Sequence, residues 1–247
     1  MSVIAADLHI HSALSPCADD DMTPQAIVYA AIVAELNLIA LCDHNCAANT
    51  AAVQKAAQTI AGDLIGVIAG MEITTSEEAH VVALFPDATC AMSASDELAE
   101  RLPSIPVDAR YGRQLIMDAG DNVLGEVTRL LSFATELDLD QAVDLIHRHD
   151  GLAVAAHVDR PSYSVISQLG LLPEDARFDA LELSAAGMKQ GRKKEFTDTG
   201  HHVITSSDAH FLTNIGDART LFEMNAPTFA ELARVLRDKQ NRRYQLA

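Results

Sequence analysis

Short runs of apolar and β-branched residues alternate with stretches in helical pattern over most of the chain. Strands are predicted at residues 3–10, 38–42, 64–74, 80–85, 152–156, 180–183, 203–206 and 220–223. Helices are predicted at residues 24–36, 47–61, 140–149, 162–169, 190–198 and 228–238. Thr23 as N-cap and Pro24 at the first helical position mark the start of the first helix. Repeated β-then-α units predict a parallel sheet, and about seven of them favour a closed α/β barrel over an open sheet.

The alternation lapses between residues 86 and 140, where prolines and turn residues interrupt the pattern. Within this segment, residues 114–117 and 123–127 are predicted to form a hairpin around a Gly-Asp-Asn turn. We interpret residues 86–140 as an insertion or lid on a single domain that covers residues 1–247.

Composition narrows the class of protein. A hydrophobic fraction of 49% with 21% charged residues is typical of a globular protein. No apolar run approaches the roughly 20 residues that span a bilayer, and the N-terminus lacks the basic and apolar regions of a secretion signal. Four cysteines in a chain of this length fit a reducing compartment better than a disulfide scaffold. These features predict a cytoplasmic protein without a membrane partner.

The chain is strongly acidic, with a formal charge of -17 from 18 Lys and Arg against 35 Asp and Glu. Such a field repels phosphate backbones, so the sequence disfavours a long nucleic acid as a partner. A small anionic phosphorylated substrate is compatible with it where metal ions reverse the local potential. The sequence carries no signal for the oligomeric state.

Histidines and carboxylates follow the predicted strands, nearly all at the C-terminal ends. His9 and His11 end the first strand, and they face the same side because side chains alternate along a strand. In α/β barrels the C-terminal strand ends share one face, where catalytic groups gather. His80 begins its strand, and a tight turn before it returns it to the edge that carries Glu72. The candidate metal ligands are His9, His11, His44, Glu72, His80, His157, Asp208 and His210.

Six histidines and two carboxylates exceed the needs of one four-coordinate zinc ion. They suit a cluster of two or three divalent ions of zinc, manganese or iron, with a carboxylate able to bridge neighbours. Glu72 is the candidate bridge because it falls between the histidine groups in sequence. Ions about 3.5–4 Å apart clamp a phosphate and lower the pKa of a shared water. The expected nucleophile is therefore a metal-bound hydroxide, with no Ser or Cys required.

Six motifs resemble those of the PHP (polymerase and histidinol phosphatase) superfamily of metal-dependent phosphoesterases. They are Asp7-Leu8-His9-Ile10-His11, Cys42-Asp43-His44-Asn45, Gly70-Met71-Glu72-Ile73, His80-Val81-Val82, Ala156-His157-Val158 and Ser207-Asp208-Ala209-His210. Each motif alone is unspecific, whereas six in the family's order are specific, and together they span most of the chain. The resemblance implies a distorted (β/α)7 TIM-like barrel. It also implies hydrolysis of a small phosphomonoester of the nucleotide, sugar phosphate or histidinol phosphate type.

The resemblance further implies how the ligands divide among the ions. They are His9, His11, Glu72 and Asp208 for the first ion, Glu72, His80 and His157 for the second, and His44 with His210 for the third. The remaining family ligand of the third ion normally follows the H-x-H motif by five or six residues, where this chain has Pro16 and Cys17. Either Cys17 or Asp19 completes that site, and Asp19 is slightly preferred because a carboxylate is the harder ligand.

Arg160 follows His157 in an Asp-Arg-Pro sequence and is the candidate substrate contact, because its planar guanidinium matches phosphate oxygens. A salt bridge to Asp159 or another neighbour is an equally frequent role for such an arginine. Asp43 is expected to orient His44, and Glu182, which lies within a predicted strand, is expected to be structural.

Two other functions are compatible with the same residues. An amidohydrolase-type C–N hydrolase also opens with an H-x-H motif. Such enzymes usually carry a bridging lysine at a strand end, and no predicted strand here ends in lysine. A non-catalytic, metal-stabilised binding module would tolerate gaps in the ligand set, and the completeness of the set weakens this alternative.

Overall fold

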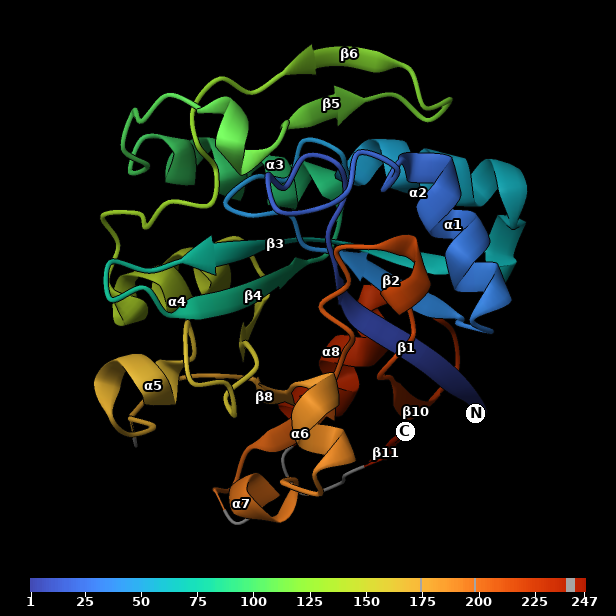
Figure 1. Cartoon of the computed structure of the whole chain (residues 1–247). Coiled ribbons are helices and arrows are strands. Elements are labelled where there is room, and N and C mark those ends of the chain that lie inside the picture. Colours follow the sequence, from blue (N-terminus) through green and yellow to red (C-terminus); the bar gives the residue numbers. More distant parts are fainter. Residues whose placement is uncertain (174, 198, 239–242) are drawn as a thin grey trace.

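The computed structural model describes residues 1–173, 175–197, 199–238 and 243–247 (Figure 1). Nine strands form one sheet in the order β11-β10-β1-β2-β3-β4-β7-β8-β9, and β5-β6 form a separate two-stranded sheet. The large sheet curls until β9 and β11 contact each other, so the barrel is nearly closed. Helices surround it, as in a distorted TIM-like barrel, and the predicted fold class is confirmed.

Six strands run parallel to one another and follow the predicted β-then-α order. They are Ser2–Ile10 (β1), Leu38–Leu41 (β2), Gly66–Thr74 (β3), Leu152–Ala155 (β7), Ala180–Leu183 (β8) and His202–Thr205 (β9). All lie within one or two residues of their predicted bounds. Their carboxyl ends therefore share one face of the barrel.

Antiparallel pairing distinguishes this sheet from the parallel one that the sequence predicts. His80–Phe85 (β4) pairs antiparallel with both β3 and β7, and Thr220–Met224 (β10) pairs antiparallel with β1 and with Tyr244–Leu246 (β11). The turn before β4 closes with a hydrogen bond from Thr75 N to Ala79 O at 2.9 Å. A connection this short leaves no room for the crossover helix that parallel strands need.

Side chains bridge the open edge of the sheet, between β9 and the β10-β11 pair. Thr220 Oγ1 accepts a hydrogen bond from Thr205 N at 2.9 Å and donates one to Thr205 O at 3.0 Å. The Tyr244 hydroxyl accepts a hydrogen bond from Val203 N at 3.0 Å. Among the described residues, these side-chain hydrogen bonds join the two edges of the sheet and bring the barrel close to closure.

The helices cover the outside of the sheet. They are Pro24–Val33 (α1), Thr50–Ile60 (α2), Ala88–Ala99 (α3), Leu139–Arg148 (α4), Val165–Leu169 (α5), Ala185–Lys189 (α6), Lys194–Thr197 (α7) and Phe229–Arg237 (α8), with short 3-10 turns at Gly62–Leu64, Ala109–Tyr111 and Leu212–Asn214. Thr23 caps α1 as predicted, accepting a hydrogen bond from Ala26 N. The predicted helix at residues 190–198 is replaced by α6 and α7, because Gly191 adopts a φ of 72° between them; residue 198 lies outside the described residues.

Helix α3 is the main element that the sequence pattern missed. Asp87 caps it by accepting a hydrogen bond from Cys90 N at 2.9 Å. Its buried residues Ala91, Ala94 and Leu98 belong to the core cluster that also contains residues of β3, β4 and α4. Since α3 packs on the barrel, we take the insertion to begin after it. We call residues 100–137 the insertion segment.

The insertion segment contains the predicted hairpin, which is confirmed. Its strands are Leu115–Met117 (β5) and Val123–Glu126 (β6), paired antiparallel. In Figure 1 the hairpin lies above α3. Whether the segment serves as a lid stays a prediction. Among the described helices, none is long and apolar enough to cross a membrane.

Candidate metal centre

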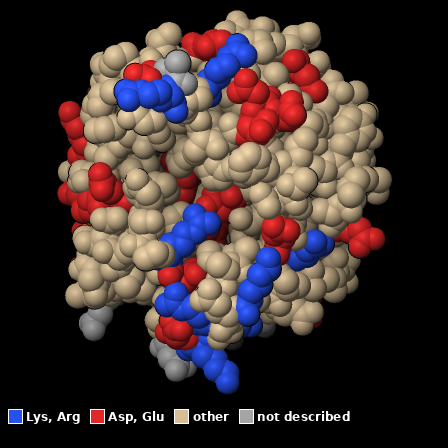
Figure 2. All heavy atoms as spheres, viewed as in Figure 1, with Lys and Arg blue, Asp and Glu red and all other residues tan. Residues whose placement is uncertain are grey.

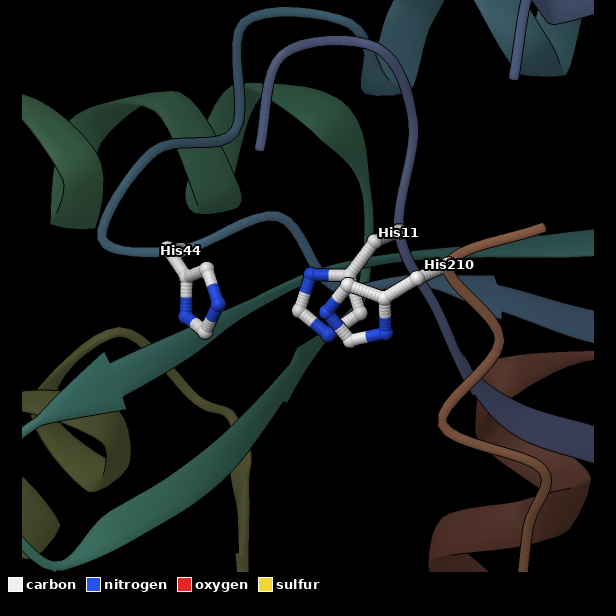
Figure 3. Close-up of side chains that lie close together, drawn as sticks. All are labelled: His11, His44 and His210. Atoms are coloured by element: carbon white, nitrogen blue, oxygen red, sulfur yellow. The ribbon is translucent and has the colours of Figure 1, made fainter. Parts of the chain in front are cut away.

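The strand ends bring all eight predicted ligands into one cluster. His9, His11, His44, Glu72, His80 and His157 are buried, while Asp208 and His210 are partly buried. Three groups have donor atoms that lie within 4.8 Å of one another: His9-His11-Asp208, His44-Glu72-His80 and His11-His44-His210. Figure 3 shows the third group, in which the rings of His11 and His210 stack at a centroid distance of 4.1 Å. Residues that are up to about two hundred positions apart thus converge on one pocket.

Glu72 lies at the centre of the cluster. Its carboxylate oxygens lie 2.8 Å from His80 Nδ1, 3.0 Å from His44 Nδ1, 3.2 Å from His157 Nε2, 3.4 Å from His9 Nε2 and 3.6 Å from His11 Nε2. Burial opposes ionisation of this carboxyl, but the charges of His80 and His9 outweigh it and hold its pKa well below the usual range. An ionised carboxylate shared by five imidazoles has the position that the bridging role requires.

His9, His11 and Asp208 form the first group of donor atoms. His9 Nε2 and His11 Nε2 lie 3.1 Å apart, and Asp208 Oδ1 lies 3.1 Å from His11 Nε2 and 3.5 Å from His9 Nε2. Burial, together with the neighbouring charge of His210, holds the pKa of His11 well below its usual range. A neutral His11 keeps a lone pair for a metal ion, as ligating imidazoles must.

Glu182 on β8 orients His9 from outside this group. Its Oε1 and Oε2 lie 3.1 Å and 3.2 Å from His9 Nδ1, and Oε1 also accepts a hydrogen bond from His157 N at 3.2 Å. A proton on Nδ1 turns the lone pair of Nε2 toward the cluster. The sequence pattern indicates only a structural role for Glu182. The available signal was a single carboxylate within the otherwise apolar strand Ala180–Leu183.

Ser15 performs the same function for His11. Its hydroxyl lies 2.9 Å from His11 Nδ1, donates a hydrogen bond to Asp43 Oδ1 at 2.7 Å, and accepts one from His44 N at 3.1 Å. Because Ser15 uses its own proton on Asp43, its oxygen is the acceptor for His11 Nδ1–H. Asp43 was expected to orient His44; among the described contacts, its carboxylate instead binds Ser12 and Ser15. It therefore supports His11 through Ser15.

The field of the cluster favours a cation. Burial opposes protonation of His9, but Glu182, Asp208 and Glu72 outweigh burial and raise its pKa well above the usual value. Imidazole nitrogens and carboxylate oxygens in this number form the donor set of a multinuclear site for zinc, manganese or iron. The residues present therefore fit a cluster of divalent ions.

Cys17, and not Asp19, lies beside the third group. Cys17 Sγ is 3.1 Å from His44 Nε2, and hydrogen bonds from His210 and His44 outweigh burial to lower the thiol pKa to about 7. Cys17 and Asp19 are both exposed, but the described side-chain hydrogen bond of Asp19 is with Asp21 N, at 2.9 Å. The preference for Asp19 is therefore not supported by the geometry.

Arg160 contacts the cluster through Asp208, its Nη1 bonded to Asp208 Oδ2. Of the two expected roles, a salt bridge to a neighbour is thus present, although the neighbour is Asp208 and not Asp159. The same side chain lines a cavity of about 130 Å³ together with His44, Glu72, His80, His157, Ser162, Tyr163, Asp208 and His210. Figure 2, drawn from the same side as Figure 1, shows acidic side chains recessed at the centre of the surface, next to a basic side chain.

The backbone of the site loops is strained at ligand positions. Asn45, His157 and Asp208 adopt positive φ angles of 48°, 29° and 53° without being glycine. Such conformations cost about 1–3 kcal/mol each and persist only where the surroundings enforce them. Strain at these positions, next to or on candidate ligands, indicates that the loops are held in place for the site.

Two family models match the chain. The PHP domain model matches residues 7–201, and the model described as PHP-associated matches residues 194–241. The chain belongs to the PHP domain family. With the clustered ligand set, this places it among the metal-dependent phosphoesterases of that family.

Sequence relatives of this PHP protein include the 5'-3' exoribonuclease Rnm of Escherichia coli (strain K12). The two are 27% identical over 83% of this chain and 84% of that protein. Among solved structures, the lesion-specific endonuclease EndoQ of Pyrococcus furiosus superposes with a TM-score of 0.69 at 19% identity, covering 99% of this chain. An Endonuclease Q complex with a 27-mer duplex substrate gives a TM-score of 0.68 at 18% identity. The PHP chain spans 58% and 57% of those two structures.

These relatives correct the expected partner. From the net charge of -17, the sequence predicts a small phosphorylated substrate and disfavours a long nucleic acid. This prediction is wrong: the relatives are named nucleases, and one was solved with a 27-mer duplex substrate. A net charge sums the whole surface, whereas a substrate meets the local field of the cleft. Positive charge is locally concentrated in this chain. Three of its five lysines lie together with one arginine within six residues of sequence: Lys189, Arg192, Lys193 and Lys194.

Proposed function

We propose that the protein is a metal-dependent nuclease that hydrolyses phosphodiester bonds, with single-stranded RNA as its first candidate substrate. The observation that carries this proposal is the Glu72-centred cluster, which offers six imidazoles and two carboxylates in one pocket. The relationship to an exoribonuclease over most of both chains supplies the substrate class.

The proposed roles of the residues follow from their contacts. His9, His11 and Asp208 would hold one ion, Glu72 with His80 and His157 a second, and His44 with His210 and Cys17 a third. Divalent ions in such a cluster offset phosphate charge and lower the pKa of bound water toward neutrality. Glu182 and Ser15 keep the His9 and His11 lone pairs directed at the ions.

Arg160 is proposed to contact a non-bridging phosphate oxygen. Its guanidinium lies at the cavity and is partly exposed, with the side chain 39% accessible. One of its nitrogens is already bonded to Asp208, and the fork geometry leaves other N–H groups for the substrate. The carboxylate–guanidinium pair also fixes the direction of the fork before substrate arrives.

The insertion segment is proposed to brace the site loops and to border the cleft, as part of one domain with the barrel. Asn45, next to His44, donates hydrogen bonds to Leu131 O at 2.7 Å and Phe133 O at 2.9 Å. Asn49 accepts one from Met117 N at 2.9 Å. Buried amides near His44 thus bind β5 and the segment that follows β6.

An exoribonuclease is preferred to a lesion-specific DNA endonuclease because of sequence similarity. The PHP chain is 27% identical to the exoribonuclease over 83% of its length, but only 19% identical to the endonuclease structure. At that lower identity the superposition supports the shared fold alone.

The test is an assay of manganese-loaded protein on 5'-end-labelled and 3'-end-labelled single-stranded RNA, with DNA and a panel of amides alongside. Progressive shortening from the 5' end, absent in His11→Ala, is expected. Cleavage of DNA alone would move the proposal to the endonuclease class. Hydrolysis only of amides would favour the amidohydrolase alternative, and no turnover of any substrate would favour a binding module.

A further inference from the structure

Tyr163 is an exposed aromatic side chain at the edge of the candidate metal centre. It lies in the loop after β7, six residues beyond His157 and three beyond Arg160, and lines the same cavity. Its ring stacks on that of His80 at a centroid distance of 4.9 Å and an interplanar angle of 25°. Even so, 48% of the residue stays exposed. The chain has few aromatic residues, 4% in total, so their placement is informative.

The size of the cavity limits what can enter it. Its volume is about 130 Å³. Pockets that enclose a whole drug-sized ligand are typically about 300–1,000 Å³. The cavity therefore accommodates a phosphate group, and the sugar and base of a nucleotide must lie at its mouth. The exposed surface at the mouth consequently decides which substrates bind well.

The backbone fixes the ring at this edge. Tyr163 adopts a φ of 57°, which a non-glycine residue keeps only where its surroundings enforce it. His80 N donates a hydrogen bond to Tyr163 O at 2.8 Å. The next residue, Ser164, caps α5 and donates to Arg160 O at 2.8 Å. The ring and the guanidinium are thus held in one loop at a set spacing.

We propose that Tyr163 is a stacking platform for the nucleobase next to the phosphate that Arg160 contacts. The inference rests on the proposed nuclease function and names the part of the substrate that the mouth of the cleft recognises. Every base offers a π-face, so such a platform binds bases without regard to sequence. A base inside a duplex already has its faces covered, so the platform favours the unpaired end of a single strand.

The experiment compares single-stranded RNA that carries a base at the nucleotide beside the scissile phosphate with RNA that is abasic at that nucleotide. Wild-type protein should cleave the abasic strand with a KM that is higher by about 5- to 100-fold. Tyr163→Ala should raise KM for the base-bearing strand to the abasic value and leave the abasic KM unchanged. Tyr163→Phe and Tyr163→Trp should keep the wild-type preference.

Tyr29 on α1, which is 53% exposed and does not line the cavity, provides the matched control. Tyr29→Ala should behave as wild type. If Tyr163 only supports His80, Tyr163→Ala lowers kcat on both strands equally, and the platform is overturned. Equal cleavage of both strands by wild-type protein also overturns it, while the nuclease proposal stands.

If wild-type protein cleaves no oligonucleotide, the nuclease proposal fails and binding becomes the readout. Titration of metal-loaded protein with adenosine monophosphate and with ribose 5-phosphate then tests the platform. Tighter binding of the nucleotide, lost in Tyr163→Ala but kept in Tyr163→Phe, supports it. Equal affinities contradict it.

Discussion

The metal centre and the β5-β6 hairpin use the same kinds of charged side chains in opposite surroundings. In the cleft, Glu72 is buried among five imidazoles, and its pKa is held well below the usual range. In the hairpin, Arg113 pairs with Glu126, and the two side chains are 52% and 48% exposed. Coulomb interactions weaken with exposure because water screens them. Burial, and not the number of charges, therefore distinguishes the candidate metal centre from a solvated surface.

The two regions are nevertheless connected. Gln114 at the base of the hairpin is buried, accepts a hydrogen bond from Leu131 N at 2.8 Å and donates to Val127 O at 2.8 Å. Leu115 N donates to Ala13 O, in the loop that follows His11. Buried hydrogen bonds of Gln114 and Leu115 thus connect the exposed hairpin to the loops of the site. Substitutions in the buried cluster should therefore change metal content and activity the most. Substitutions of exposed hairpin residues, away from the buried Gln114, should change them the least.

Glu72→Gln should have the largest effect. Removing the central charge leaves the imidazoles without their common partner, so metal content should fall and activity should drop by about 10³-fold or more. Metal analysis and initial rates measure both. Glu78→Gln, an exposed acid in the turn between β3 and β4, is the control and should match wild type. Full metal content in Glu72→Gln would show that the carboxylate does not bridge ions.

Glu182→Gln should have the next largest effect. The neutral amide is a weaker acceptor for His9 Nδ1–H, so metal affinity should fall by about 10- to 100-fold. Competition with a chelating dye measures the affinity. An unchanged affinity would show that the buried contact to His9 is structural only.

Cys17 variants test the third group of ligands. Cys17→Ala should remove one ion per chain, whereas Cys17→Asp should keep it, because a carboxylate restores a ligand beside His44. Cadmium-loaded wild-type protein should show a thiolate-to-metal absorption band that both variants lack. Asp19→Ala is the matched control and should leave the stoichiometry unchanged. Loss of an ion in Asp19→Ala, with the band absent from wild type, would restore the original preference for Asp19.

Glu126→Gln should have the smallest effect. The pair with Arg113 is exposed on both sides, so its loss should leave the melting temperature and the metal content unchanged within error. Thermal unfolding followed by circular dichroism checks this. A fall comparable to that of Glu72→Gln would mean that the hairpin contributes to the centre through its exposed pairs.

The fold and the set of candidate ligands that the structure brings together were predictable because each depends on local pattern. Alternating strands and helices, and histidines at strand ends, appear directly in the sequence. Helix α3 was missed because its buried face is built largely from alanine and serine, which give little apolar periodicity. Strand β11 was also missed, because it is only three residues long and pairs with β10 at the edge of the sheet.

The supporting contacts of the centre were not predictable, since they depend on the tertiary arrangement. Glu182 lies 173 residues from His9, and nothing local in β8 shows that its side chain reaches that ring. The choice between Cys17 and Asp19 depends on how the loop between His11 and Met22 folds, which counting residues along the sequence leaves open. The partner was mispredicted because the total charge was used in place of the field at the cleft.

Anomalous diffraction from crystals of metal-loaded protein, recorded at the manganese, iron and zinc edges, tests the metal centre most directly. Two or three peaks should appear within the cluster, with Glu72 between neighbouring ions and Cys17 beside the ion at His44 and His210. An empty cluster in fully loaded crystals, or ions bound only at surface carboxylates, would contradict a multinuclear centre.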